Sequence, residues 1–192
     1  MQIGLYFGSF NPVHIGHLLV ATHIREAANL DEIWFIVSPQ NPFKKNNYLA
    51  PEKHRLEMVK LAIEPVSNFK VLDIEFNLPK PSYTHLTLKE LIKIYPNYDF
   101  KLIIGADNLE RLHEWKEIGW IMNNIELLVY NRNIENKNTV NIKQQQIINY
   151  YQLPLFDISS TEIRNRIKEN KSIHYFVTEK IVLYIRNKNL YK

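Results

Sequence analysis

The sequence has no cysteine and only five glycines among its 192 residues. The absence of cysteine excludes disulfide bonds, thiolate zinc sites and cysteine nucleophiles, so any bound metal would need oxygen or imidazole ligands. No stretch approaches the ~20 consecutive apolar residues of a membrane-spanning helix, and the N-terminus lacks the basic and then apolar layout of a signal peptide. These absences predict a soluble, cytoplasmic protein with no membrane partner and no metal site of its own.

The sequence also has no basic tract, although its net charge is +4. Its 24 Lys and Arg residues are dispersed, which favours phosphorylated small molecules over a nucleic-acid lattice as partners. Hydrophobic residues make up 45% of the chain, enough for a substantial core, and we expect a single domain over residues 1–192. The asparagine- and glutamine-rich stretch over residues 131–152 is expected to form a loop and a helix.

Short apolar runs alternate with helical patterns along the chain. The runs predict strands over residues 2–7, 33–38, 70–76, 100–104, 125–130 and 153–157. Apolar residues at helical spacing predict helices over residues 17–28, 56–63, 88–95, 160–168 and 178–187. This alternation favours a Rossmann-like, doubly wound α/β fold with a parallel sheet, in which ligands bind beyond the carboxyl ends of the strands.

The loop after the first strand, GSFNPVHIGH over residues 8–17, combines the features of a phosphate site. The helix that begins near Val13 or His14 offers free N–H groups and the positive end of its dipole. His14 and His17 share one face of its first turn, and Gly16 leaves room for a bulky phosphate. Two imidazole donors suit attack on phosphorus. We hypothesise that both rings are neutral in the free protein and become charged when nucleotide binds; ordinary helix-surface histidines are the alternative.

This loop resembles the nucleotide-binding signature of the nucleotidylyltransferase superfamily, which includes adenylyltransferases and class I aminoacyl-tRNA synthetases. A second motif of that superfamily is matched by ISSTEIR, residues 158–164, at another strand-to-helix junction. Ser159 or Ser160 would cap this helix, and Arg164 would reach a β- or γ-phosphate. The resemblance implies the nucleotidylyltransferase, or HIGH-superfamily, fold. The chain is much shorter than a synthetase and lacks the lysine-rich loop, which disfavours that branch.

Four further segments resemble bacterial nicotinate-nucleotide adenylyltransferases, and with the two motifs they cover most of the chain. They are PQNPFKK (39–45), PSYTHLTLKEL (81–91), IGADNLERLHEW (104–115) and VYNRN (129–133). In that family the first of these loops meets the mononucleotide phosphate, and Lys44 here replaces a histidine of the family pattern. The Thr84 backbone would meet the nicotinate carboxylate, and Trp115 would stack on the pyridine ring, although its helical spacing also suits a core residue.

The resemblance implies a full set of site residues. The catalytic residues would be His14, His17 and Arg164. ATP would be bound by Gly8, Ser9, Phe10, His14, Gly16, His17, Gly105, Asp107, Ser159, Ser160, Thr161 and Arg164. The acceptor would be bound by Asn41, Lys44, Lys45, Tyr83, Thr84, Trp115, Lys116 and Arg132.

The implied reaction is attack by a phosphate oxygen of nicotinate mononucleotide on the α-phosphorus of ATP, which yields the deamido dinucleotide and pyrophosphate. Mg²⁺ would be carried on the triphosphate with few or no protein ligands. Three alternatives remain open: an enzyme for nicotinamide mononucleotide, an enzyme for phosphopantetheine, and a catalytically silent nucleotide sensor. The partners would be ATP and the mononucleotide, with no nucleic acid and no membrane, and a homo-oligomer is compatible with the sequence.

Overall fold

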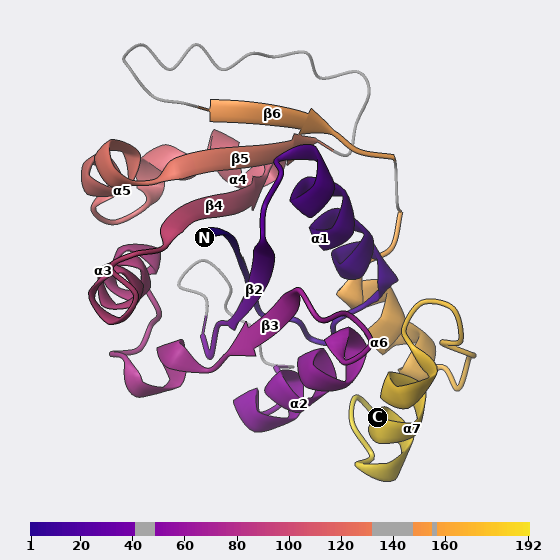
Figure 1. Ribbon diagram of the computed structural model, residues 1–192. Coiled ribbons are helices and arrows are strands. Elements are labelled where there is room, and N and C mark those ends of the chain that lie inside the picture. Colours follow the sequence, from indigo (N-terminus) through magenta and orange to yellow (C-terminus); the bar gives the residue numbers. More distant parts are fainter. Residues whose placement is uncertain (41–48, 132–147, 155–156) are drawn as a thin grey trace.

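A wholly parallel, six-stranded sheet forms the centre of the protein (Figure 1). The computed structural model describes residues 1–40, 49–131, 148–154 and 157–192. Its strands are β1 (Gln2–Gly8), β2 (Glu32–Val37), β3 (Phe69–Leu72), β4 (Asp99–Gly105), β5 (Glu126–Asn131) and β6 (Ile148–Gln152). The strand order is β3-β2-β1-β4-β5-β6. The chain therefore starts at the centre of the sheet, adds β2 and β3 on one side of β1, and then adds β4, β5 and β6 on the other side. This is the Rossmann-like topology expected from the sequence.

Helices cover both faces of the sheet (Figure 1). They are α1 (Ile15–Ala27), α2 (Glu52–Ile63), α3 (Thr84–Ile94), α4 (Ala106–Glu110), α5 (Ile118–Asn124), α6 (Ser160–Lys168) and α7 (Glu179–Asn187), with short 3₁₀ turns η1 (Ile74–Asn77) and η2 (Leu112–Glu114). Buried residues of α1, α2, α6 and α7 belong to one apolar cluster, and those of α3, α4, α5 and η2 to another. The sheet therefore separates two cores.

Strand β2 shows why this sequence forms a central strand. Phe35 packs into the cluster under α1 and α2, whereas Trp34 and Ile36 pack into the cluster under α3. Successive side chains point to opposite faces, and here both faces are covered, so every position after the first, Glu32, is apolar. The continuous apolar runs of the sequence therefore mark the inner strands correctly.

The expectations for the third and sixth strands were partly wrong. Strand β3 ends at Leu72 and is followed by η1, because Phe76 N donates to Asp73 O at 2.8 Å and turns the chain away from the sheet. The sixth strand is Ile148–Gln152, not 153–157, and it replaces the end of the helix expected within residues 131–152. Its Tyr151 pairs with Tyr130 of β5. Strand β6 lies at the sheet edge, where polar residues are tolerated. Its sequence therefore mixes polar and apolar residues and lacks the apolar run by which the other strands were predicted.

The last two expected helices are present: α6 has the expected bounds, and α7 begins one residue later, after Thr178 as N-cap. Across the four described segments, none of the helices combines the length and apolar character needed to traverse a lipid bilayer.

Candidate active site

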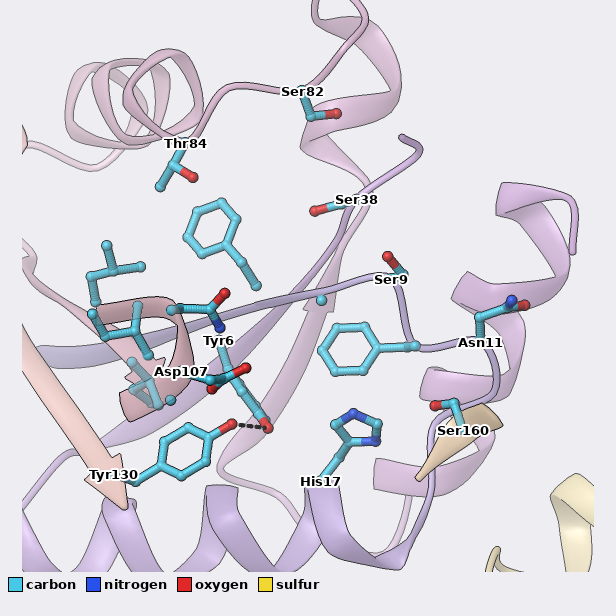
Figure 2. Close-up of a pocket in the computed structure, with 18 of the residues that line it drawn as sticks. Tyr6, Ser9, Asn11, His17, Ser38, Ser82, Thr84, Asp107, Tyr130 and Ser160 are labelled. Carbon is cyan, nitrogen blue, oxygen red and sulfur yellow. Dashed lines mark hydrogen bonds between the residues drawn. The ribbon is translucent and has the colours of Figure 1, made fainter. Parts of the chain in front are cut away.

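A cleft of about 750 Å³ opens beyond the carboxyl ends of β1 and β4, at the point where the strand order reverses. Polar side chains from far-apart segments converge on it, among them His17, Asp107 and Ser160 (Figure 2). Most of the site residues implied by the resemblance line this cleft: Gly8, Ser9, Phe10, His14, His17, Tyr83, Thr84, Gly105, Asp107, Trp115, Lys116, Ser159, Ser160, Thr161 and Arg164. The fold thus gathers both ends of the chain and its middle around one cavity.

Gly8 and Phe10 shape the first loop. Phe10 is 2% exposed and adopts a left-handed backbone conformation with φ of 45°, which is unusual for a residue with a side chain. A Cβ atom on Gly8 would lie only 2.7 Å from the Phe10 ring. Glycine at position 8 therefore lets the aromatic ring fold back beneath the loop, and the loop backbone faces the cleft.

The His14 and His17 rings lie in contact at the start of α1, with centroids 3.7 Å apart and ring planes tilted by 34°. His17 Nδ1 accepts a hydrogen bond from the His14 backbone N–H at 3.2 Å. A nitrogen that accepts carries no proton, so neutral His17 carries its proton on Nε2, as a donor. A second proton on Nδ1 would break the bond to His14. The hypothesis that both rings become charged when nucleotide binds stays a prediction.

Gly16 does not line the cleft, although the sequence suggested that it makes room for phosphate. A Cβ atom at this position would lie 3.1 Å from His14 Nδ1. Such contacts are tight for a Cβ, so the glycine accommodates the His14 ring. Its effect on the site is therefore indirect.

The ISSTEIR motif bonds directly to the first loop. Ser160 Oγ donates to Pro12 O at 2.8 Å, and Arg164 Nη1 donates to Asn11 O at 2.8 Å. Ser159, the second serine offered by the sequence, is the N-cap, because its Oγ accepts from Glu162 N at 3.1 Å. Burial lowers the pKa of the Arg164 guanidinium, with Tyr191 acting in the opposite direction. The N-terminal and C-terminal motifs are therefore parts of one wall of the cleft.

The opposite wall of the cleft carries two aromatic side chains, a lysine and the N-terminus of a helix. Tyr83 is the N-cap residue of α3 and Thr84 its first residue, so the positive end of this helix lies at the cleft. Lys116 Nζ lies 4.8 Å from the centroid of the Tyr83 ring. Trp115 lines the cleft and also packs against the core cluster of α3 and α5. The core contact is therefore present, and stacking of this tryptophan on a pyridine ring stays a prediction.

Between these walls lie Asp107 of α4 and a pair of tyrosines. The Tyr6 and Tyr130 hydroxyls are 3.3 Å apart at the strand ends (Figure 2). A Cβ atom on Gly105 would overlap the Asp107 carboxylate, so glycine here permits that carboxylate to fold back over the end of β4. Four expected acceptor residues, Asn41, Lys44, Lys45 and Arg132, lie outside the described residues.

The structure adds cleft residues that the sequence did not identify, chiefly Asn11, Ser38, Glu75 and Ser82. Ser38 directly follows β2 and Asn11 lies in the loop after β1, and these positions could have marked them. Nothing in the sequence marked Glu75 as a cleft residue, because it lies within residues 70–76, which were predicted to form a strand. It is 1% exposed, and Thr87 Oγ1 donates to its Oε1 at 2.8 Å.

Burial raises the pKa of the Glu75 carboxyl above its ordinary value, while the hydroxyls of Thr87, Ser38 and Ser82 act in the opposite direction. Burial likewise lowers the pKa of His85 in the first turn of α3, with nearby Lys89 adding to the shift. Low dielectric surroundings thus disfavour the charged forms of both groups. Within the described segments, no three His, Asp or Glu side chains cluster in a way that could hold a metal ion.

The cytidylyltransferase-like family model matches residues 5–166. The chain is 46% identical over 192 residues to a probable nicotinate-nucleotide adenylyltransferase of Flavobacterium johnsoniae, covering 100% of both chains. It is 42% identical over 186 residues to a protein of the same name in Bacteroides thetaiotaomicron, covering 97% of this chain and 91% of that one.

Solved structures support the fold. Nicotinic acid mononucleotide adenylyltransferase of Plasmodium falciparum, complexed with NaAD, matches with a TM-score of 0.83 and 23% identity over 99% of this chain and 97% of that one. A putative nicotinate-nucleotide adenylyltransferase of Vibrio parahaemolyticus matches with a TM-score of 0.71 and 21% identity, over 99% and 94% of the two chains. With the sequence relatives, the family is clear: this chain belongs to the cytidylyltransferase-like family and, within it, to the nicotinate-nucleotide adenylyltransferases.

Proposed function

We propose that this protein transfers the adenylyl group of ATP to nicotinate mononucleotide, releasing deamido-NAD and pyrophosphate in NAD biosynthesis, and that residues 1–192 act as one domain. The observation that carries the proposal is the joined wall of the cleft. Arg164 and Ser160 bond to the backbone oxygens of Asn11 and Pro12, so the two phosphate-binding motifs of the family face one cavity. A cavity of about 750 Å³ is within the range of small-molecule sites.

The chemistry needs alignment and charge neutralisation more than a protein nucleophile, because the mononucleotide phosphate is already an anion at neutral pH. A phosphate oxygen of the acceptor attacks the α-phosphorus, and the bond to the bridging oxygen of pyrophosphate breaks. His17 donates through Nε2 to the charge that builds on the phosphoryl oxygens. Arg164 and the N–H groups at the start of α1 neutralise the departing pyrophosphate.

The acceptor end of the cleft favours an acid over an amide. The N-terminus of α3 and Lys116, beside the Tyr83 ring, make this end positive. A nicotinate carboxylate gains from that field, whereas an uncharged carboxamide gains much less. Trp115 supplies a flat apolar surface for the pyridine ring.

Mg²⁺ belongs with the substrate in this scheme. We assign the ion to the triphosphate, where it neutralises phosphate charge. We further propose that the protein acts in the cytoplasm on these two small molecules, without nucleic acid or membrane. A homo-oligomer is compatible with the proposal.

The test is a pyrophosphate-release assay with ATP and one of three acceptors: nicotinate mononucleotide, nicotinamide mononucleotide or phosphopantetheine. We expect the highest kcat/KM with the nicotinate compound and no release without an acceptor. Equal values for the acid and the amide would refute the selectivity. ATP binding without release with any acceptor would indicate a nucleotide sensor.

A further inference from the structure

Asn11 is the centre of a hydrogen-bond network behind the first loop. Its side-chain Oδ1 accepts from Ala50 N at 3.1 Å and from the Tyr191 hydroxyl at 2.9 Å. A carbonyl oxygen has two lone pairs, so these two donors together fix which way the amide points. The backbone oxygen of the same residue accepts from Arg164. The orientation of Asn11 thus depends on groups from three distant parts of the chain.

Arg55 holds the same loop from beneath. Its side chain is 0% exposed and donates to the backbone oxygens of Ser9 at 2.6 Å, Ser38 at 2.7 Å, Pro39 at 3.0 Å and Ala50 at 2.9 Å. It therefore ties together the loops that follow β1 and β2. Ala50 links Arg55 to Asn11, because its backbone oxygen accepts from Arg55 and its backbone N–H donates to Asn11 Oδ1.

Tyr191 closes this network and stays a hydrogen-bond donor. Burial raises the pKa of its hydroxyl, more strongly than the nearby guanidinium groups of Arg55 and Arg164 lower it. The phenol therefore keeps its proton at neutral pH. Tyr191 itself does not line the cleft, so its hydroxyl acts on the site through Asn11, which does.

We propose that Tyr191 is a positioning residue for adenylyl transfer, which orients Asn11 and thereby holds the phosphate-binding loop of residues 9–12 in register with Arg164. The inference rests on the proposed function. Without the hydroxyl, Asn11 Oδ1 loses one of its two fixed donors, and the loop gains freedom where the triphosphate must be aligned. Small misplacements of this kind cost catalysis far more than they cost folding.

The chain offers a matched control for the loss of one phenol oxygen. The Tyr184 hydroxyl lies 2.8 Å from His54 Nδ1, between α7 and α2 and away from the cleft. Tyr191→Phe and Tyr184→Phe therefore remove the same atom from hydrogen bonds of similar length. We expect Tyr191→Phe to lower kcat/KM for ATP roughly tenfold. Tyr184→Phe should stay within about twofold of the unchanged protein, with a similar melting temperature in both variants.

A double-mutant cycle separates positioning from general stability. In an Asn11→Ala background, Tyr191→Phe should change kcat/KM for ATP by less than about twofold, because the group it orients is gone. A purely structural role would predict the same loss in both backgrounds. The proposal is overturned if Tyr191→Phe alone stays within twofold, if Tyr184→Phe is equally impaired, or if the losses add independently.

Failure of the proposed function would be seen separately, as absence of pyrophosphate release by the unchanged protein with all three acceptors. The same variants are then compared by the binding of a non-hydrolysable ATP analogue, measured by calorimetry. Weaker binding by Tyr191→Phe alone supports the role in orienting the loop. Equal binding by the unchanged protein and both variants refutes it.

Discussion

Single residues in the cleft can stabilise the local fold with one atom and offer another atom to the substrate. His17 is the example: its Nδ1 accepts from the backbone of the residue that caps its own helix, and this bond sets the tautomer that presents Nε2–H as a donor. In the proposed mechanism, this capping contact is what presents the ring to the phosphate.

Replacing His17 by alanine should lower kcat by about 10²–10³-fold, as loss of a preorganised donor to a developing charge does elsewhere. His23→Ala is the control, because His23 belongs to the same helix but does not line the cleft. Steady-state pyrophosphate release measures both variants. A loss below threefold in His17→Ala would remove this histidine from the mechanism.

Glu75 predicts a pH-dependent stability. In the unfolded chain the Glu75 carboxyl loses its proton near the ordinary pKa of 4.5. In the folded protein burial raises the pKa, so the carboxyl keeps its proton to a higher pH. Deprotonation above pH 4.5 therefore favours the unfolded state, and stability falls as the pH rises, by at most ~1.4 kcal/mol per pH unit, until the folded pKa is passed. Glu75→Gln has no such proton to lose.

Urea unfolding between pH 4.5 and 8 tests this expectation. The free energy of unfolding of Glu75→Gln, relative to the unchanged protein, should increase across the lower part of this range. A constant difference would show that Glu75 titrates alike in both states.

At the scale of elements, the two serines at the start of α6 make different contacts. Ser159 satisfies a free N–H at the helix start, whereas Ser160 bonds to the first loop. Ser159→Ala should lower the free energy of unfolding by about 1 kcal/mol, the usual cost of a lost N-cap, with a smaller effect on kcat/KM for ATP than Ser160→Ala. Ser160→Ala should instead affect kcat/KM for ATP. Chemical denaturation and steady-state kinetics distinguish the two, and the reverse pattern would contradict the assignment.

The sequence predicted elements best where both faces are buried or a cap is present. Strands such as β2 are apolar after their first residue, and α6 follows a serine that caps it, so their bounds were close to those observed. The short β3 and the edge strand β6 were misplaced, because one-sided burial leaves a weaker pattern. The cleft residues came mostly from motifs, whereas Glu75 and Tyr191 act through contacts between distant segments that no local pattern encodes.

For the whole molecule, the joined wall of the cleft predicts that ATP stabilises the fold. ATP at ~100 times its Kd should add about 2.7 kcal/mol to the free energy of unfolding. For a chain of 192 residues this corresponds to a rise in Tm of roughly 5–10 °C.

Arg164→Ala should lose most of this rise. Arg166→Ala should keep it, because Arg166 lies on the same helix but outside the cleft, where it donates to Ser172 O beyond the end of the helix. Thermal melting with and without ATP measures the rise in each variant, so differences in basal stability cancel. A full rise in Arg164→Ala would show that the arginine does not contact the nucleotide.

The hydrogen bond from Arg164 to Asn11 spans 153 positions, and that from Tyr191 spans 180. When the ribosome has synthesised only the first strand and its loop, the two residues that donate these hydrogen bonds to Asn11 have not yet been made. Arg164 and Tyr191 are translated long after the loop, and a domain folds as its segments become available. We therefore expect a nascent chain stalled before residue 164 to carry the first loop without these two side chains that hold it.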